Sequence, residues 1–414
     1  MPLKRSSENL ITIPTYWSPG KINGEKEQVV YDHPTPLDKE GTLARCVKSL
    51  EILKGPDFDL LIVAGASTPE IQNNMADKVK EIVKQTRTKL SGNVYLFTSG
   101  QLDLCWEIME KLPPSGKGFM EVQGYSNIRN TLLTLGSLIG AERIIMIDDD
   151  EYITDTDFLG KIVRVLGTRV GGKTVDGLAG RYINPDGSWQ TKEYDEPWST
   201  FWPKNRSINQ TYKRLLEGEN NPELVETPMV FGGCMALTKY LYRRIPFDRR
   251  VPRGEDIDYL INARMFGYHF FMHRFLSIIH DPPPKFHSEW KAMRQDIVRF
   301  IHERLKLEQQ VSKLNMDRVD LEDLEPYPAS FLAGDIVDRF FRTSNLLAID
   351  YLVRGYSEDA KECLKNIAIA KSAYENPRDS FEDLLHLQEV WEQMHQAIAG
   401  DSICRKRMHE LLVE

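Results

Sequence analysis

Apolar residues follow two alternating patterns along the first 150 positions, short continuous runs and helical spacings. The runs LITIPTY, LLIVAGAS and VYLFTSG, which start at residues 10, 60 and 94, predict three buried strands. Between them, residues 42–53 and 68–90 have apolar side chains at helical spacing, and the second stretch opens with the capping-type run STPE. Strands that alternate with helices indicate βαβ units. We therefore predict an α/β fold with a central, mostly parallel sheet.

The fourth predicted strand ends in acidic residues. A helix expected over about 126–140 leads into RIIMIDDDEYI, whose apolar residues indicate a buried strand. Ligands of open α/β sheets bind at the carboxyl edge, where such strands end. Beyond residue 155 the chain is rich in loops, and from about residue 288 nearly all of it has a helical pattern. The predicted domains are residues 1–287, with halves 1–155 and 156–287, and a C-terminal helical bundle over 288–414.

Composition and charge narrow the classes of protein. The 414 residues carry a formal net charge of -8, which argues against nucleic acid as a main partner, because phosphate neutralisation needs a dominant basic surface. No apolar stretch approaches the roughly 20 residues of a membrane span, and the run Leu10 to Ile13 is too short for a signal peptide. The five cysteines never have CxxC spacing, so the sequence suggests neither a zinc site nor a disulfide framework. We expect a cytoplasmic protein without an integral membrane segment.

Asp148, Asp149 and Asp150 stand where the fourth strand leaves the sheet. Adjacent carboxylates repel each other, so such a cluster favours a bound cation. Mg²⁺ or Mn²⁺ suits this position, because both bind hard oxygen ligands together with phosphate oxygens. By strand alternation Asp148 and Asp150 point to one side and Asp149 to the other. The residues alone leave a second interpretation open, a solvated acidic turn.

Two further segments carry candidate ligand-binding residues. Arg129, in the helix-opening run YSNIRN, precedes the acids at a spacing that returns helix and strand to one edge of the sheet. It is a candidate contact for a diphosphate, and a salt bridge on the helix surface is the alternative. Gly232 and Gly233 allow a backbone to approach a ligand closely.

Downstream, two segments combine acids and a histidine. Glu255 and Asp256 follow Gly254 and open a helix, whose dipole tolerates acids at this end. A functional pair and a plain helix cap both fit this pattern. His280 ends the apolar run LSIIH, where it can ligate a metal, contact a phosphate or be structural.

Taken in order, these segments resemble the family 2 glycosyltransferases and their relatives with the nucleotide-sugar-binding glycosyltransferase A fold. The resemblance is carried by ITIPTY, YSNIRNTLLTLGSLIGAERIIMIDDDEYI, GGCMALTK and RGEDIDYLINARMFG. The family has an Arg-Asn helix, an Asp-Xaa-Asp motif, a glycine-bearing segment and a Glu-Asp pair in this order. The resemblance implies a Rossmann-like catalytic domain over 1–287. It also implies metal-dependent, non-processive transfer of a hexosyl group from a UDP- or GDP-sugar to a hydroxyl of a small molecule or glycan.

The resemblance implies a role for each matching residue. Asp150 would be the direct metal ligand, with Asp148 as the other member of the motif and His280 as a third ligand. Asp256 would be the general base that deprotonates the acceptor hydroxyl in an inverting reaction, and Glu255 would orient it or bind the acceptor. The residues expected to bind the donor are Pro14, Tyr16, Arg129, Asp148, Asp149, Gly232 and Gly233.

Several features leave alternatives open. The turn VAGAST replaces the aspartate-rich turn that reads the nucleobase in the family, and no Gln-Xaa-Xaa-Arg-Trp motif follows the Glu-Asp pair. A retaining enzyme of the mannosylglycerate-synthase type shares the expected fold. A sugar nucleotidyltransferase fits less well, because PTYWSPGKINGEK is no glycine-rich basic loop. A non-catalytic scaffold that binds glycan or protein is the alternative from another class, and the C-terminal helices are a candidate homodimer surface.

Aromatic residues gather in the loop-rich region, and two interpretations are open for them. Rings stack on the apolar faces of sugars, so they can form a sugar or acceptor platform, or they can fill an irregular small core. These residues are Trp189, Tyr194, Trp198, Phe201 and Trp202.

Overall fold

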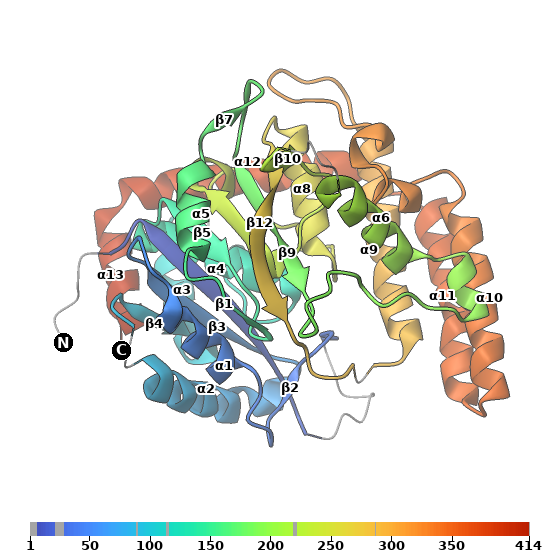
Figure 1. Cartoon of the computed structure of the whole chain (residues 1–414), viewed down its shortest axis with the longest axis horizontal. Helices are drawn as coiled ribbons and strands as arrows, with labels where there is room; N and C mark the ends of the chain where they lie inside the picture. The colour runs from blue at the N-terminus through green and yellow to red at the C-terminus, as the bar shows by residue number, and fades with distance from the viewer. Residues whose placement is uncertain are drawn as a thin grey trace.

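Ten of the described strands form one mixed sheet through the middle of the molecule (Figure 1). The computed structural model describes residues 6–20, 29–87, 90–112, 116–217, 222–285 and 287–413. Part of the loop PTYWSPGKINGEK lies outside these residues. The spatial order of the strands is β10-β12-β9-β11-β5-β1-β3-β4, with β2 beside β1 and β6 beside β12. Their bounds are β1 (Asn9–Ser18), β2 (Thr35–Pro36), β3 (Asp59–Ala66), β4 (Val94–Phe97), β5 (Arg143–Met146), β6 (Glu151–Tyr152), β9 (Gly177–Ile183), β10 (Leu224–Glu226), β11 (Met235–Thr238) and β12 (Phe270–His280).

Helices surround this sheet, and a small separate hairpin is made by β7 (Arg169–Val170) and β8 (Lys173–Thr174). The α-helices are α1 (Leu43–Ser49), α2 (Gln72–Thr86), α3 (Ser99–Met109), α4 (Tyr125–Ile139), α5 (Phe158–Val165), α6 (Lys204–Leu216), α7 (Lys239–Tyr242), α8 (Glu255–Met265), α9 (Glu289–Gln309), α10 (Ile336–Val353), α11 (Ser357–Glu375), α12 (Ser380–Gly400) and α13 (Ser402–Val413). Short 3₁₀ turns include η5 (Pro197–Thr200) and η6 (Gly232–Cys234).

The strands are apolar on both faces because helices cover both. In β3, Leu61 and Val63 join the larger core cluster, while Leu60 and Ile62 on the opposite face join the second cluster. The second cluster contains residues of α1, α2 and α5, and the larger one contains residues of α3, α4, α8 and α9. Burial on both faces explains why these strands have continuous apolar runs rather than an alternating pattern.

The topology brings distant segments to one edge of the sheet. Strands β3 and β5 both pair in parallel with β1, so the carboxyl ends of the three strands lie at the same edge. Strand β11 is antiparallel to β5, with Met235 opposite Met146, so η6 enters the sheet at this edge. The end of β12 pairs with β6, where His280 lies opposite Glu151. The acids after β5, the glycine pair and the histidine therefore meet.

The C-terminal helices are part of the same core rather than a bundle apart. Met293 and Phe300 of α9 belong to the same cluster as Leu10 of β1, and so does Trp391 of α12. The hairpin of α10 and α11 lies against α9 at one end of the molecule, whereas α12 and α13 extend behind the sheet to its other end (Figure 1). There α13 contacts β4, α3 and α4, and the Tyr95 hydroxyl lies 3.3 Å from His409 Nε2. The division of the chain into two domains at residue 287 stays a prediction. The larger core cluster contains residues from both sides of this position.

The predicted α/β class, with its central sheet and C-terminal helices, is confirmed. The sheet has antiparallel pairings of β11, β10 and β6 beside the predicted parallel ones. Two local expectations need correction. The pattern did not indicate α3, and the hydroxyl of Thr68 accepts no capping hydrogen bond at the start of the second helical stretch, which begins instead as a 3₁₀ turn with proline in its first turn.

Among the described residues, no helix is long and apolar enough to cross a membrane. All five cysteines are buried free thiols. Their burial explains their places in the sequence as small core residues.

Candidate active site

A cleft of about 490 Å³ opens at the sheet edge where the predicted site residues meet. Segments from the whole length of the chain contribute to its lining. Of the predicted residues, the cleft is lined by Tyr16, Arg129, Asp148, Asp149, Asp150, Gly232, Glu255, Asp256 and His280. Pro14 lies within β1, opposite Val63 of β3, and neither it nor Gly233 is among the lining residues.

Arg129 ties two of the acids together beneath the cleft. Its Nη2 donates to Asp148 Oδ1 at 2.8 Å, and its Nε donates to Glu255 Oε1 at 3.2 Å. The side chain is only 3% exposed, and its Nη1 has no hydrogen-bond partner among the described residues. A buried guanidinium with an unused N–H beside a cleft is suited to an anionic ligand, because unsatisfied buried donors are costly. The alternative interpretation of Arg129, a salt bridge on the helix surface, is excluded because the side chain is buried.

Burial dominates the electrostatics of these acids. Burial raises the pKa of Asp148, and the nearby Arg129 opposes the rise. Burial and the neighbouring carboxylate of Asp256 raise the pKa of Glu255 to about 7, again against the pull of Arg129. Carboxyl groups with such a pKa exchange protons near neutral pH, and perturbed groups of this kind cluster at functional sites.

Asp149 and Glu151 hold the turn after β5 in place through hydrogen bonds. The Asp149 carboxylate accepts a hydrogen bond from the Thr15 hydroxyl at 2.5 Å, and Glu151 Oε2 accepts from the Asp148 amide at 2.9 Å. Glu151 is fully buried. It is a residue of the DDDE run for which the sequence indicated no separate role, and its structural role is to fix the backbone of Asp148.

The glycine pair makes room for charged side chains. A Cβ on Gly232 would stand 2.5 Å from Arg129 Nη2, and one on Gly233 would stand 2.1 Å from Glu151 Oε1. Real Cβ atoms do not approach other atoms so closely, so only glycine fits at both positions. The two glycines therefore act through the protein's own side chains, and Gly232 in addition lines the cleft.

Asp150 and His280 face each other across the cleft. His280 Nε2 lies 3.7 Å from Asp150 Oδ2, and Tyr182 stacks on the His280 ring with centroids 4.7 Å apart. Two ligands of one ion with bonds of about 2.1 Å lie roughly 3 to 4 Å apart, so this pair fits a divalent metal. Because Asp148 accepts a hydrogen bond from Arg129, Asp150 is the acid better placed to ligate a cation.

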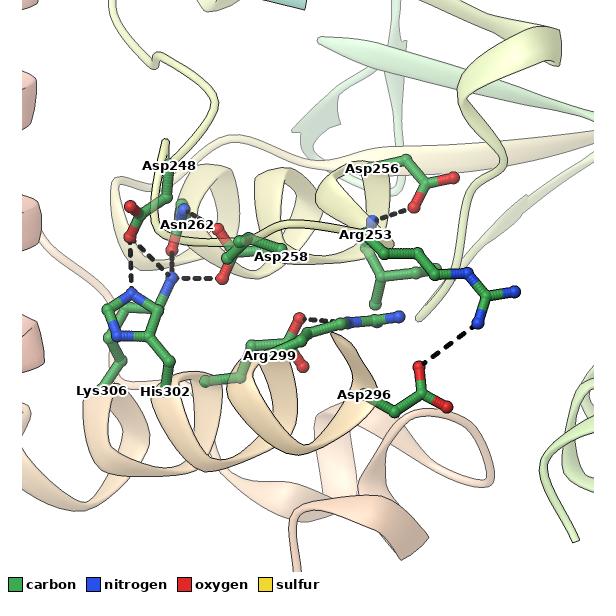
Figure 2. A network of polar contacts seen from close by, with 12 residues as sticks. Asp248, Arg253, Asp256, Asp258, Asn262, Asp296, Arg299, His302 and Lys306 are labelled. Carbon is green, nitrogen blue, oxygen red and sulfur yellow. Dashed lines mark hydrogen bonds and ion pairs between the residues drawn. The ribbon is translucent and has the colours of Figure 1, made fainter. Parts of the chain in front are cut away.

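Asp256 stands at the start of α8 with its carboxylate oriented by two backbone amides. Its Oδ2 accepts from the Gly232 amide at 2.9 Å, and its Oδ1 accepts from the Ile257 amide at 2.8 Å; Figure 2 shows the position of Asp256 at the start of the helix. Each carboxylate oxygen keeps a second lone pair, so the group can still accept a proton from a ligand in the cleft. The plain helix cap and a catalytic role are both compatible with these contacts.

A buried charge network from α9 fixes the helix that carries Asp256. At one end, Lys306 pairs with Asp258, donates to Asn262 Oδ1 at 2.9 Å and lies 3.6 Å from Asp248 (Figure 2). At the other end, Arg299 donates to Glu303 Oε1 at 2.7 Å and lies directly beneath Gly254.

Gly254 explains the close packing at that end of the network. Its φ of +70° is unfavourable for other residues, and a Cβ there would meet Arg299 Nη1 at 1.9 Å. Arg299 itself lines the cleft, so the first helix of the C-terminal region contributes to the site.

The aromatic residues of the loop region divide between the two interpretations. Trp202 is 5% exposed and packs on Phe300, Phe331 and Phe340, so it is part of the larger core cluster. Trp198 is buried as well. Tyr194 lines the cleft, where it is available to a ligand.

Sequence patterns did not indicate several lining residues, because they lie on loops or on helices whose partners are far away in sequence. These residues are Asp32, His33, Tyr125, Tyr182, Lys204, Lys285 and Arg299.

The fold and site define an α/β protein with a cleft, lined by both acidic and basic side chains, at the carboxyl edge of its sheet. Three solved structures similar to the chain are named as a mannosyltransferase, a mannosyl-3-phosphoglycerate synthase and a glucosyl-3-phosphoglycerate synthase. A mannosyltransferase from Pyrobaculum calidifontis in complex with GDP-Man and Mn²⁺ is 12% identical over 96% of this chain and 88% of its own, with a TM-score of 0.45. A mannosyl-3-phosphoglycerate synthase from Rubrobacter xylanophilus is 14% identical over 74% of this chain and 77% of its own, with a TM-score of 0.38.

A third similar structure is a glucosyl-3-phosphoglycerate synthase from Mycobacterium tuberculosis in complex with Mn²⁺ and UDP-glucose. It is 13% identical over 73% of this chain and 78% of its own, with a TM-score of 0.35. No protein-family model and no curated protein matches the chain. At these identities and TM-scores the similar structures by themselves assign no activity, and the function proposed below rests on the geometry of the site.

Proposed function

We propose that the protein is a metal-dependent, non-processive glycosyltransferase. It transfers a hexosyl group from a UDP- or GDP-sugar to a hydroxyl of a small-molecule or glycan acceptor, with inversion at the anomeric carbon. The observation that carries the proposal is that a carboxylate–histidine pair spaced for a cation and a buried guanidinium N–H, unpaired among the described residues, lie in one cleft. Asp150 and His280 are spaced for a metal, and Arg129 has an unused buried N–H. A nucleoside diphosphate bound with a divalent metal needs both.

Asp256 is placed to act as the general base. The acceptor hydroxyl gives its proton to the Asp256 carboxylate while its oxygen forms a bond to the anomeric carbon. The bond from that carbon to the diphosphate oxygen breaks, and its electron pair leaves with the diphosphate. The Gly232 amide holds the Asp256 carboxylate in position for this step. Glu255, paired with Arg129, keeps the guanidinium next to the leaving group.

In this proposal Asp150 and His280 hold the cation, and Asp148 beside them pairs with Arg129. When bound, Mn²⁺ or Mg²⁺ neutralises charge on the diphosphate. Arg129 adds a fixed positive charge in a site with little water, where such a charge stabilises a leaving anion more than it would in solution. Tyr16 lines the same cleft, where its buried hydroxyl has no hydrogen-bond partner among the described residues.

Two measurements test the proposal. Calorimetric titration of the full chain with UDP and with GDP, each with and without Mn²⁺, is expected to show metal-dependent binding, which a non-catalytic scaffold lacks. Hydrolysis and transfer from a panel of nucleotide-sugars then identify the donor. Asp150→Asn is expected to abolish metal-dependent binding. Asp256→Asn is expected to lower transfer by a factor of about 10² to 10⁴, while donor binding is retained.

A matched control is Asp157→Asn, because Asp157 forms an exposed ion pair with Arg164 away from the cleft. It is expected to behave like the wild type in both assays. Metal-dependent binding that survives Asp150→Asn unchanged would refute the metal assignment. Equal loss of binding and transfer in Asp256→Asn would refute its role as base.

Two further expectations belong with this proposal. A reducing compartment such as the cytoplasm suits five buried free thiols. A homodimer through the C-terminal helices has a candidate surface on α10, where Phe341, Ile349 and Leu352 are each more than half exposed. Analytical ultracentrifugation tests the dimer.

A further inference from the structure

The loop between β1 and α1 places a second histidine beside Asp150 and His280. His33 lines the same cleft as these two residues. Its ring centroid lies 6.5 Å from that of His280, and the charge of Asp150 acts on its imidazole. The resemblance to known families gives this histidine no role, and none of the steps proposed above uses it.

The hydrogen bond of His33 determines which ring nitrogen is free. Nδ1 lies 2.7 Å from the carbonyl oxygen of Pro283. A carbonyl oxygen can only accept, so Nδ1 carries the proton and donates, and Nε2 of the neutral ring keeps its lone pair. A lone pair can bind a cation, but it cannot donate to a phosphate. Histidines that ligate metals commonly donate their other ring nitrogen to a backbone carbonyl in this way.

The chain just before this histidine is anchored at several points. Asp32 accepts from Arg253 Nε at 2.8 Å, and its amide donates to the Tyr125 hydroxyl at 2.6 Å. Gln295 of α9 donates to the carbonyl of Val30 at 3.0 Å. These contacts anchor the backbone that carries His33 beside the cleft, which reduces the entropy that ordering this loop on binding would cost.

We propose that His33 is a third protein ligand of the divalent metal, together with Asp150 and His280. The assignment rests on the proposed function, since the metal accompanies the nucleotide-sugar. In the described part of the chain, no group of three His, Cys, Asp or Glu side chains is arranged to hold a metal ion. The assignment therefore requires the His33 side chain to turn toward Asp150 and His280 when the metal binds.

Two imidazole ligands also make the choice of metal more specific. Mg²⁺ demands oxygen ligands and keeps several waters, whereas Mn²⁺ accepts imidazole nitrogen more readily. The site with both histidines is therefore expected to prefer Mn²⁺ over Mg²⁺. Replacing one histidine with a carboxylate shifts this preference toward Mg²⁺.

Mn²⁺ itself is the probe. Electron paramagnetic resonance of the full chain, with UDP or GDP present, measures the Mn²⁺ affinity, and pulsed methods count the nitrogen nuclei bound to the ion. Two histidine nitrogens are expected in the wild type and one in His33→Gln or His280→Gln. The affinity is expected to fall at least about tenfold in His33→Gln. His33→Asp supplies a carboxylate, so it is expected to retain binding with one nitrogen fewer.

His386→Gln on the exposed side of α12 is the matched control, and it is expected to leave both readouts unchanged. The assignment is overturned if His33→Gln keeps two nitrogens and the wild-type Mn²⁺ affinity while His280→Gln loses one nitrogen. That outcome leaves the proposed function intact. A wild-type chain that binds no Mn²⁺ with either nucleotide overturns the proposed function and this assignment together. Thermal melting shows whether each variant is folded. If His33→Gln does not fold, the nitrogen count in His33→Asp decides whether His33 is a metal ligand.

Discussion

The buried ion pair between Lys306 and Asp258 gives the sharpest test of how α9 supports the site. Both side chains are 0% exposed, and Lys306 also lies near Asp248 and donates to Asn262 (Figure 2). Lys306→Met keeps the aliphatic stem but removes the charge. It leaves the carboxylate of Asp258 buried without its cation, and breaking a buried pair in this way costs about 3 to 5 kcal/mol.

The expected change in melting temperature follows from the size of the chain. Unfolding entropy is about 2.1 cal/mol/K per residue, so 414 residues give about 0.9 kcal/mol/K, and the loss corresponds to a fall of about 3 to 6 °C. Urea unfolding followed by circular dichroism measures the free energy directly. The m-value is expected to stay constant, because the surface exposed on unfolding hardly changes.

A double-mutant cycle separates the pair from general damage. Asp258→Asn combined with Lys306→Met removes both charges, and the combined loss is expected to be smaller than the sum of the single losses by at least about 1.5 kcal/mol. The matched control is Lys361→Met, because Lys361 pairs with Glu358 at 2.6 Å on the exposed surface of α11. Its expected cost is below about 1 kcal/mol. The reasoning fails if Lys306→Met costs no more than the control, or if the two losses simply add.

Two further predictions concern the cleft. Gly233→Ala places a Cβ against the buried Glu151 carboxylate, so it is expected to cost about 1 to 3 kcal/mol in urea unfolding and to weaken Mn²⁺-dependent nucleotide binding. Gly100→Ala on exposed α3 is the control and is expected to be neutral or slightly stabilising; equal effects would contradict the packing at Gly233. Because the pKa of Glu255 is raised to about 7 in the folded state, the unfolded chain binds fewer protons there between pH 5 and 7, so stability falls as the pH rises through this window. Glu255→Gln is expected to remove up to about 3 kcal/mol of that loss between pH 5 and 7.5, and an unchanged slope would show that Glu255 titrates normally.

The parts of the fold that local patterns encode were accessible from the sequence. The runs in β1, β3, β4 and β5 are apolar because both faces are buried, and such runs have few other interpretations. The acids after β5 follow from the same pattern, since strand ends of parallel neighbours share an edge. Short elements such as β6 and η6 carry no pattern of their own and depend on tertiary pairing.

The roles of individual side chains were harder to predict. The DDDE run does not reveal that Asp148 faces Arg129 or that Glu151 supports the turn, because these roles depend on which atoms are neighbours in space. In α9, a helical pattern of polar residues normally faces water, so the pattern does not indicate that Lys306 is buried. Its partner Asp258 lies in α8, 48 residues earlier in the chain, and could not be paired with it from spacing alone.

The position of α13 against β4, α3 and α4 has a consequence for how the chain is made. The apolar side of these early elements is completed by α13. At about 5 to 20 residues per second, roughly 13 to 50 s separate the synthesis of α4 from that of α13. During that interval the nascent sheet carries an uncovered apolar flank, so a chaperone that shields that flank would raise the yield of folded protein.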